Sequence, residues 1–318
     1  MKFLKPLFLL FIFCVSSCFA ESFKFVAYGD MPYKIPDDFS RYEKLIRVIN
    51  QSKPAFTLFV GDTKSGSTPC TDEYNLVVKN YFNQFNSPLI YSIGDNEWTD
   101  CHRPLAGGYD PLERLEKLRQ YFFKDRLSFG KKSMLLYRQA DVMKEYSTYV
   151  ENSYWIKNDF LFVSIHIPGS NNNLGRTKEA DEEYLTRNSA NLTWIDYCFR
   201  LAETKHVKGI VFGFQADMFQ EKKLAKEPTS GFKDTIESLS SHAQAFKKPV
   251  LLINGDSHRL LIDQPLKTTN SKFVLENVLR LQVMGEDQVE AVEVEVNPSS
   301  KQPFTFKPIL IPENNNYQ

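Results

Sequence analysis

Short apolar segments alternate with longer amphipathic segments along most of the chain. Runs rich in Val, Ile, Phe and Tyr are typical of strands buried on both faces of a sheet. Four such runs are Phe23–Tyr28, Phe56–Val60, Leu89–Ile93 and Val250–Asn254. Between the first three, apolar residues recur at helical spacing in Asp37–Ser52 and Asp72–Phe85. This β-α-β-α-β order predicts a parallel sheet with helical crossovers.

The remainder of the chain extends this α/β pattern. Further strands are predicted at Phe160–Ile165 and Gly209–Phe214, and further helices at Pro111–Phe122, Ala190–Thr204 and Phe232–Phe246. Residues 98–158 interrupt the alternation and predict a lid or cap within one domain that spans residues 21–318. Residues 278–311 contain three segments of alternating polarity, Val278–Val283, Val289–Val296 and Phe304–Ile311. That alternation predicts a half-exposed antiparallel edge.

Each of the four apolar runs is followed directly by a Gly-Asp pair. The pairs are Gly29-Asp30, Gly61-Asp62, Gly94-Asp95 and Gly255-Asp256. Ligand sites of α/β proteins form at the carboxyl ends of their strands, so adjacent strands would bring these aspartates together. Carboxylates at such proximity need a counter-charge, which predicts bound cations. A single Gly-Asp pair is ordinary turn chemistry, but four of them after buried strands favour a site.

The first twenty residues have the features of an export signal. Lys2 and Lys5 precede Leu7–Val15, an apolar segment too short to span a bilayer. Cleavage after Ala20 is predicted, and a lipobox with a lipid anchor on Cys18 is the alternative. Both interpretations export the protein to the periplasm or beyond it. No other stretch is long and apolar enough to predict a transmembrane helix.

Composition excludes some function classes. Lys+Arg and Asp+Glu number 39 each, so no excess of basic residues predicts a nucleic-acid-binding patch. No Gly-x-Gly-x-x-Gly motif follows the first strand, which argues against a dinucleotide-binding protein. Cys70 and Cys101 each follow a Gly-Asp pair, and an oxidising compartment favours a disulfide between them.

The order of these motifs resembles the calcineurin-like metallophosphoesterases over about residues 23–265. The matching segments are Asp30-Met31-Pro32, Gly61-Asp62-Thr63-Lys64, Gly94-Asp95-Asn96-Glu97, Phe214-Gln215-Ala216-Asp217 and Gly255-Asp256-Ser257-His258. In that family the corresponding motifs are Asp-x-His, Gly-Asp-x-x, Gly-Asn-His-Glu/Asp, a lone His and Gly-His-x-His. Gly94-Asp95-Asn96-Glu97-Trp98 together with Gly255-Asp256-Ser257-His258 is similar to an exported bacterial branch. The resemblance implies a four-layer sandwich of two mixed β-sheets flanked by helices.

The resemblance also implies two metal sites that share Asp62. The first set is Asp30, Asp62 and His258, and the second is Asp62, Asp95, Gln215 and Asp256. Glu97 is placed behind them, where it would orient the ligands. This oxygen-rich set favours two divalent ions, Mn²⁺ or Mg²⁺ over Zn²⁺, with Ca²⁺ as an alternative. Because the extra carboxylates weaken the activation of water by the metal, we expect activity to improve in alkali.

The implied activity is hydrolysis of a phosphate mono- or diester by a metallophosphoesterase. Asn96 stands where the family has a catalytic His, and an amide cannot donate a proton as an imidazolium does. His102 and Arg103, just beyond this motif, are the candidates for protonating the leaving group and for holding the phosphate. The alternative is a catalytically inactive member whose carboxylates hold a structural metal and whose rim binds a ligand or a partner.

Overall fold

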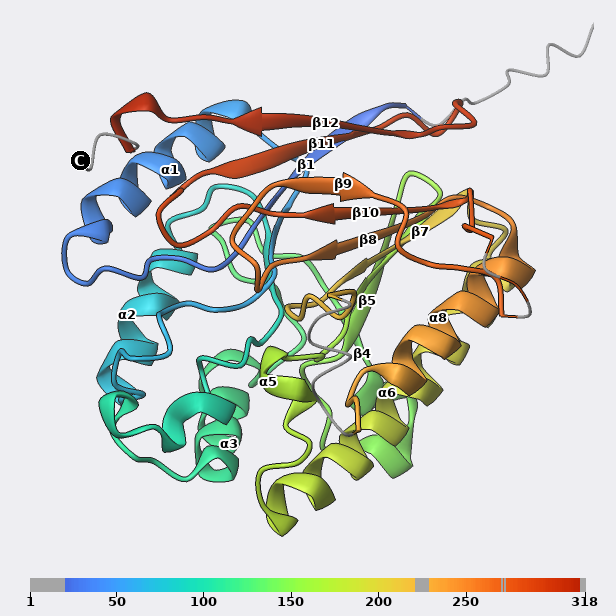
Figure 1. The fold of residues 1–318 in the computed structure, drawn as a ribbon. Coiled ribbons are helices and arrows are strands. Elements are labelled where there is room, and N and C mark those ends of the chain that lie inside the picture. Colours follow the sequence, from blue (N-terminus) through green and yellow to red (C-terminus); the bar gives the residue numbers. More distant parts are fainter. Residues whose placement is uncertain (1–20, 221–228, 270, 272, 315–318) are drawn as a thin grey trace, which may run out of the picture.

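The computed structural model describes residues 21–220, 229–269, 271 and 273–314. The predicted leader, with its cleavage site after Ala20 and the alternative anchor at Cys18, lies outside these residues. Two stacked β-sheets form the centre of the described part, and helices cover the outer face of each sheet (Figure 1). This arrangement is the four-layer α/β sandwich that the sequence predicts.

The first sheet has five strands in the order β12-β11-β1-β2-β3. Their bounds are Phe304–Ile309 for β12, Ala291–Val296 for β11, Phe23–Tyr28 for β1, Thr57–Phe59 for β2 and Leu89–Tyr91 for β3. β1, β2 and β3 are parallel, with Tyr28 opposite Phe59 and Phe59 opposite Tyr91. This register brings the three Gly-Asp pairs that follow these strands to one edge of the sheet.

The second sheet has seven strands in the order β4-β5-β6-β7-β8-β10-β9. Their bounds are Tyr137–Arg138 for β4, Ser153–Lys157 for β5, Phe160–Ser164 for β6, Gly209–Gly213 for β7, Val250–Asn254 for β8, Val278–Gln282 for β10 and Leu261–Asp263 for β9. β6, β7, β8 and β10 run parallel to one another. Gln215, which follows β7, and Asp256, which follows β8, therefore lie at the same edge.

Helices pack on both outer faces because their apolar residues recur on one side. α1 (Asp38–Ser52), α2 (Asp72–Phe82) and α3 (Pro111–Phe122) cover the first sheet, and α6 (Lys178–Thr204) and α8 (Lys233–Phe246) cover the second (Figure 1). Shorter turns include α4 (Gln139–Val142), α5 (Gly169–Asn172) and the 3-10 helices Thr99–His102, Pro104–Ala106, Lys144–Tyr146 and Pro312–Asn314.

An aromatic core fills the space between the two sheets. The rings of Phe25 and Phe56 stack at 4.9 Å, and Phe162 of the other sheet meets both edge-on. Each fully buried Phe side chain contributes roughly 1.5–3 kcal/mol relative to an exposed one. This core fixes the sheets against each other and so holds their carboxyl edges together.

Residues 98–158, predicted as a lid or cap, contribute to the sandwich itself. Leu115 and Leu118 of α3 are buried in the core beneath the first sheet, beside α2. β4 and β5 extend the second sheet at its edge. The 3-10 helix Thr99–His102 is the part of this segment that lies closest in sequence to the Gly94-Asp95 pair.

The predicted antiparallel edge is correct for two of the three C-terminal segments. β11 pairs antiparallel with β1, and β12 forms the edge of the first sheet beside it. The prediction is wrong for β10, which pairs in parallel with β8 and is covered by β9. Its polar residue Arg280 is buried and pairs with Asp217 and Asp263, at 2.8 and 2.6 Å. From the sequence alone, a polar residue that is buried with its ion-pair partners cannot be distinguished from an exposed polar residue.

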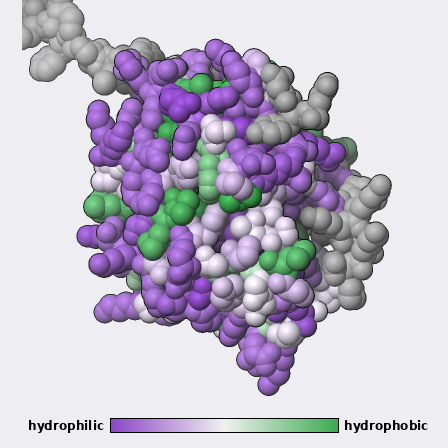
Figure 2. All heavy atoms as spheres, turned by 90° about the vertical axis from the view of Figure 1, so that its left-hand side faces the viewer, coloured by the Kyte–Doolittle hydropathy of each residue, from purple (hydrophilic) through white to green (hydrophobic). Residues whose placement is uncertain are grey.

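The face that carries α1, α2 and α3 is mainly hydrophilic, and its apolar side chains lie in small separate groups (Figure 2). Among the described helices, none combines the length and the apolar character needed to cross a membrane.

Candidate metal centre

The glycines of the Gly-Asp pairs make room for the aspartates of neighbouring strands. A Cβ atom added to Gly255 would lie 2.1 Å from Asp30 Oδ2, and one added to Gly94 would lie 2.1 Å from Asp62 Oδ1. Carbon atoms do not approach carboxylate oxygens so closely, so only glycine fits at either position. The repeated dipeptide therefore has a spatial cause, because the glycine of one motif accommodates the carboxylate of another.

Several of these residues have left-handed backbone conformations. The φ angles are 54° for Asp30, 60° for Asp62, 69° for Asp256 and 55° for His258. This conformation costs roughly 1–2 kcal/mol for a residue with a Cβ atom, although Asp and His tolerate it better than most. Strained residues that cluster in this way are typical of functional sites.

Asp30, Asp62 and His258 form a compact group of possible metal ligands. One oxygen from each carboxylate and one ring nitrogen lie within 4.8 Å of one another. Asp30 Oδ1 accepts a hydrogen bond from the backbone N–H of Asp256 at 2.9 Å. Asp30 Oδ2 is buried and has no hydrogen-bond partner among the described residues. A buried carboxylate oxygen without a donor is well suited to a cation, so these residues fit a metal ion.

Two residues that the sequence analysis missed hold the imidazole of His258. Glu286 Oε2 lies 2.9 Å from Nδ1, which leaves Nε2 facing Asp30 Oδ1 at 3.5 Å. The Tyr33 hydroxyl lies 3.2 Å from Nε2 and donates to Asp62 Oδ2 at 2.9 Å. A carboxylate on the far nitrogen is the usual support of a metal-binding histidine. Tyr33 follows Asp30 by three residues, but no sequence signal marks Glu286.

The pKa shifts of this group indicate that its buried carboxylates need a positive charge beside them. Burial raises the pKa of Asp62 well above its usual range, and the nearby Asp95 and Glu97 charges raise it further. Burial also raises the pKa of Asp30 to about 6, although the hydrogen bond and charge of His258 oppose this. Burial lowers the pKa of His258, but Asp30 and Glu286 outweigh it and raise the value to about 9. In the absence of a cation, His258 therefore carries the counter-charge.

The residues predicted for the second metal site are engaged in hydrogen bonds within the protein. Gln215 Nε2 donates to Asp62 Oδ2 at 3.2 Å and to Asp95 Oδ1 at 3.1 Å. Asp95 Oδ2 accepts from the Ser170 hydroxyl at 2.8 Å. Asp256 Oδ2 accepts from the backbone N–H of Asp217 at 3.0 Å. The structure thus brings Asp95 and Gln215 together with Asp62, and each side chain already has partners.

The third motif contacts the Asp62 loop through both Asn96 and Glu97. Asn96 Nδ2 donates to Asp62 Oδ2 at 2.8 Å and to the Tyr33 hydroxyl at 3.0 Å. Glu97 Oε1 accepts from the backbone N–H of Thr63 at 2.7 Å and from the Tyr91 hydroxyl at 3.0 Å. Glu97 therefore supports the loop that carries Asp62.

Lys64 is a third residue that the sequence analysis missed. Its side chain is buried, and Nζ donates to the backbone carbonyl of Asn96 at 2.6 Å. Burial lowers the pKa of Lys64 to about 8, while the negative charges of Glu97 and Asp62 oppose this shift. Its position two residues after Asp62 is the only sequence signal, and a lysine in a loop is usually exposed.

A left-handed turn closes the site from the second sheet. Ser170, Asn171, Asn172 and Asn173 have φ angles of 46°, 53°, 56° and 66°. Asn tolerates this conformation because its short side chain bonds locally. The turn directs the Ser170 hydroxyl to Asp95 Oδ2 and to Asp100 Oδ1, at 2.8 and 2.7 Å.

The centre opens into a cavity of about 670 Å³. Asp62, Asp95, Asn96, Asp256 and His258 line it, together with Arg103, Arg176, Asn171 and Phe232. The Arg103 guanidinium pairs with Asp100 at 2.8 Å, and its side chain is 48% exposed. His102 is exposed and is not among the lining residues; its Nδ1 lies 2.7 Å from the Thr99 carbonyl. The structure therefore brings Arg103 to the site but not His102.

A disulfide links the two loops that follow β2 and β3. Cys70 and Cys101, predicted as a pair, are bonded, with their Cα atoms 5.9 Å apart. This bond holds the 3-10 helix that precedes Arg103 against the loop that follows Asp62.

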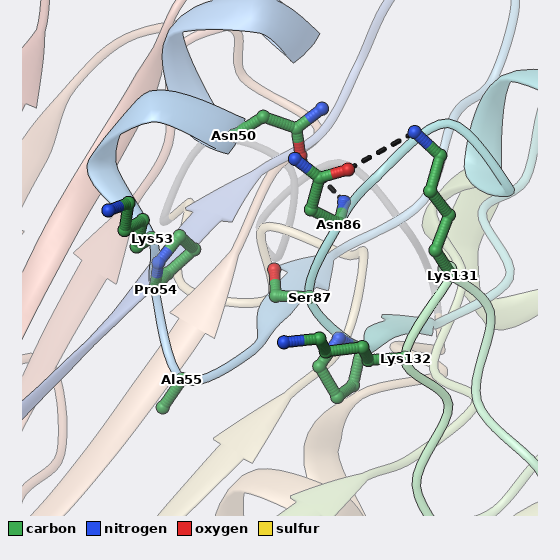
Figure 3. Close-up of a pocket in the computed structure, with 9 residues that line it drawn as sticks. Asn50, Lys53, Pro54, Ala55, Asn86, Ser87, Lys131 and Lys132 are labelled. Carbon is green, nitrogen blue, oxygen red and sulfur yellow. Dashed lines mark hydrogen bonds between the residues drawn. The ribbon is translucent and has the colours of Figure 1, made fainter.

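A second hollow of about 510 Å³ lies at the opposite ends of β2 and β3 (Figure 3). Its lining comes from Asn50, Lys53, Pro54, Ala55, Asn86, Ser87, Pro88, Lys131 and Lys132. Lys131 Nζ donates to Asn86 Oδ1 at 3.1 Å, and no Asp or Glu lines this hollow. The acidic rim is therefore the stronger candidate for a cation-dependent site.

Comparisons with known proteins establish the fold. No protein-family model matches the chain, and no curated protein is found similar to it. A solved dimetal phosphatase from Danio rerio is similar in structure at a TM-score of 0.54 and 10% identity, over 90% of this chain and 99% of that one. PhoD is similar at 0.52 and 9% identity, over 90% and 68% of the two chains.

GAP50, the anchor in the inner membrane complex of Plasmodium, is similar at a TM-score of 0.51 and 10% identity, over 91% of this chain and 89% of that one. At these identities the similarities define the fold and not the activity. The chain has the calcineurin-like metallophosphoesterase fold that its motifs predict.

Proposed function

We propose that this protein is a metal-dependent phosphoesterase that hydrolyses a phosphate mono- or diester. The observation that supports this proposal most strongly is the group of Asp30, Asp62 and His258. Their ligand atoms lie within 4.8 Å of one another, and Asp62 and His258 line an open cavity. When bound there, a divalent cation supplies positive charge to the phosphoryl oxygens and activates water. Two carboxylates and one imidazole suit Mn²⁺ or Mg²⁺ better than Zn²⁺.

Arg103 is the proposed phosphate-binding residue. Its guanidinium lines the cavity and is partly exposed while it pairs with Asp100. A guanidinium can form two parallel hydrogen bonds with a phosphate, which fixes the orientation of the ester. Arg176 also lines the cavity and adds positive charge at its mouth.

The cavity favours esters with good leaving groups. His258 is the only imidazole among the described residues that line it, and its two nitrogens face Asp30 and Glu286. The Asn96 amide donates to Asp62 and Tyr33 and has no proton to give to an alkoxide. A missing general acid typically costs 10²–10⁴-fold in rate when the leaving group is poor.

The second candidate function is binding without turnover. The observation that favours it is the same position of Asn96, which replaces an imidazole and turns toward Asp62. The similarity in fold to GAP50, an anchor, is compatible with such a role. In this case the metal would stabilise the rim, and the cavity would hold a phosphorylated ligand without cleaving it.

Export is part of the proposal. The disulfide between Cys70 and Cys101 supports it, because such bonds persist in oxidising compartments. Mass spectrometry of protein purified from the producing cell distinguishes the two predicted forms. A chain that begins at Glu21 indicates ordinary cleavage, and a lipid-modified Cys18 indicates an anchored lipoprotein. A chain that retains Met1 would contradict both.

The activity is tested with metal-stripped protein and two chromogenic esters, 4-nitrophenyl phosphate and bis(4-nitrophenyl) phosphate. Mn²⁺, Mg²⁺, Zn²⁺ and Ca²⁺ are added in separate reactions. We expect hydrolysis that Mn²⁺ or Mg²⁺ restores best and that Asp62→Asn abolishes. Lack of hydrolysis of both esters with every metal that the protein binds would contradict the enzyme and favour the binding protein.

A further inference from the structure

The orientation of the Gln215 amide is determined by a backbone group. Gln215 is fully buried, and its Oε1 accepts a hydrogen bond from the N–H of Gly169. A backbone N–H can only donate, so the amide oxygen must face Gly169. The amide NH₂ group therefore faces Asp62 Oδ2 and Asp95 Oδ1, at 3.2 and 3.1 Å.

This NH₂ group lies where the sequence resemblance implies a second metal ion. An amide nitrogen has no lone pair to offer a metal, and its hydrogens already point at both carboxylates. Turning the amide round would place two donors, Gln215 Nε2 and Gly169 N, against each other. It would also leave a buried backbone N–H without an acceptor, which is strongly unfavourable.

Gln215 also has no room to move aside. A Cβ atom added to Gly61 would lie 2.7 Å from Gln215 Cγ and 2.9 Å from the Gly94 Cα. The Gln215 side chain is therefore packed closely against Gly61. Close packing of this kind fixes the position of the amide as well as its direction.

Lys64 is buried in the loop that follows Asp62. Its Nζ donates to the backbone carbonyls of Asn96 and Ser65, at 2.6 and 3.3 Å. The side-chain donor that faces both Asp62 and Asp95 is therefore the Gln215 amide.

Asp30 and Asp95 differ in whether a carboxylate oxygen lacks a hydrogen-bond donor. Both oxygens of Asp95 have hydrogen-bond donors, Gln215 and Ser170. Asp30 Oδ2, in contrast, is buried without a partner among the described residues. A cation therefore gains a buried oxygen without another partner at Asp30, whereas at Asp95 it would face the hydrogens of the Gln215 amide.

We infer that the centre holds one divalent ion, bound by Asp30, Asp62 and His258. The Gln215 amide takes the place of a second ion. This inference rests on the proposed function, because it concerns the same centre, and it departs from the expectation of two ions.

Metal stoichiometry tests the inference without any use of activity. Metal-stripped protein is titrated with Mn²⁺ by calorimetry, and the loaded protein is examined by electron paramagnetic resonance. We expect one Mn²⁺ per chain, with the spectrum of an isolated ion. We expect Asp30→Asn to abolish binding and Asp95→Asn to retain it.

The matched test introduces a ligand that would create a second metal site. Gln215→His replaces the amide with an imidazole, and we expect two ions per chain and a spin-coupled spectrum. Gln264→His, at a position remote from the centre, serves as the control and should leave one ion.

Two ions in the wild-type protein would overturn the inference and leave the proposed function standing. Binding of no ion at all would overturn the proposed function itself. The wild-type stoichiometry decides between these outcomes even if the Gln215 variant does not fold.

Discussion

The Asp30 carboxylate occupies the space that a side chain on Gly255 would need. A Cβ atom on Gly255 would lie 2.1 Å from Asp30 Oδ2, the oxygen that has no hydrogen-bond partner among the described residues. The two residues are 225 positions apart in the sequence and come from different sheets. The geometry of the metal ligand thus depends on a glycine in the other half of the sandwich.

Gly255→Ala should therefore damage the metal site directly. The added methyl group must displace the Asp30 carboxylate, at a cost of about 1–3 kcal/mol in the free energy of unfolding. We expect the affinity for Mn²⁺ to fall at least tenfold. Calorimetry measures the affinity, and urea denaturation measures the stability.

Gly175→Ala is the control for this substitution. Gly175 has a positive φ of 93°, but no atom lies within 4 Å of an added Cβ. Gly255 is not among the glycines with a positive φ, so the control carries a backbone cost that Gly255→Ala lacks. It should nevertheless leave the affinity for Mn²⁺ unchanged. Equal loss of affinity in both variants would show that the contact with Asp30 is not the cause.

Arg103 and His102 should differ in their effects on catalysis. Arg103 lines the cavity, whereas the His102 ring is turned to the Thr99 carbonyl. Arg103→Gln should raise KM for 4-nitrophenyl phosphate about 10–100-fold, since hydrogen bonds to charged groups contribute about 1.5–3 kcal/mol. His102→Gln should leave kcat and KM within a factor of two. A large loss of kcat in the His102 variant would instead identify His102 as the proton donor.

Metal binding should stabilise the fold. Mn²⁺ at a hundredfold excess over its Kd adds about 2.7 kcal/mol to the free energy of unfolding, which raises Tm by about 5 °C. Asp30→Asn should remove this increase because it removes a metal ligand. Differential scanning calorimetry with and without chelator measures both effects. An Asp30→Asn protein that Mn²⁺ still stabilises fully would place the ion elsewhere.

A buried network remote from the cavity should make the protein sensitive to acid. Glu151 is buried and contacts Arg119 at 2.7 Å and His166 Nδ1 at 3.1 Å. Burial raises the pKa of Glu151, but Arg119 and His166 outweigh it and hold the pKa well below its usual range. Burial holds the pKa of His166 below its usual value, against the effect of Glu151.

The sign of the pH dependence follows from these directions. A depressed pKa of Glu151 stabilises the fold at a pH above the usual value of a glutamate, and this stability is lost as the pH falls. The neutral form of His166 is likewise favoured in the fold, so its protonation destabilises the protein below pH 6.5. The Tm measured in thermal melts should therefore decline progressively as the pH falls below 6.5.

Glu151→Gln isolates this network from the metal centre. The substitution leaves the Arg119 guanidinium without its carboxylate partner and should cost roughly 3–5 kcal/mol. The stoichiometry of Mn²⁺ should not change, because Glu151 does not line the cavity. A variant as stable as the wild type would show that the ion pair between Glu151 and Arg119 makes no net contribution to the free energy of unfolding.

The sequence predicts the convergence of Asp30, Asp62 and Asp256 well because strand ends and Gly-Asp pairs are local signals. It does not predict that the Gln215 amide points its nitrogen at the carboxylates. That direction depends on Gly169, which a left-handed turn brings to the site from the end of another strand. The burial of Lys64 is equally hidden, since its acceptor is a backbone carbonyl and leaves no trace in the residue pattern.

The most direct test of the account measures bound metal and hydrolysis in the same samples. Metal-stripped protein receives increasing Mn²⁺, and the ions retained per chain are compared with the rate of bis(4-nitrophenyl) phosphate hydrolysis. We expect the rate to rise in proportion to the first ion and to reach its plateau at one ion per chain. Retention of the ion without hydrolysis, or hydrolysis that begins only with a second ion, would contradict it.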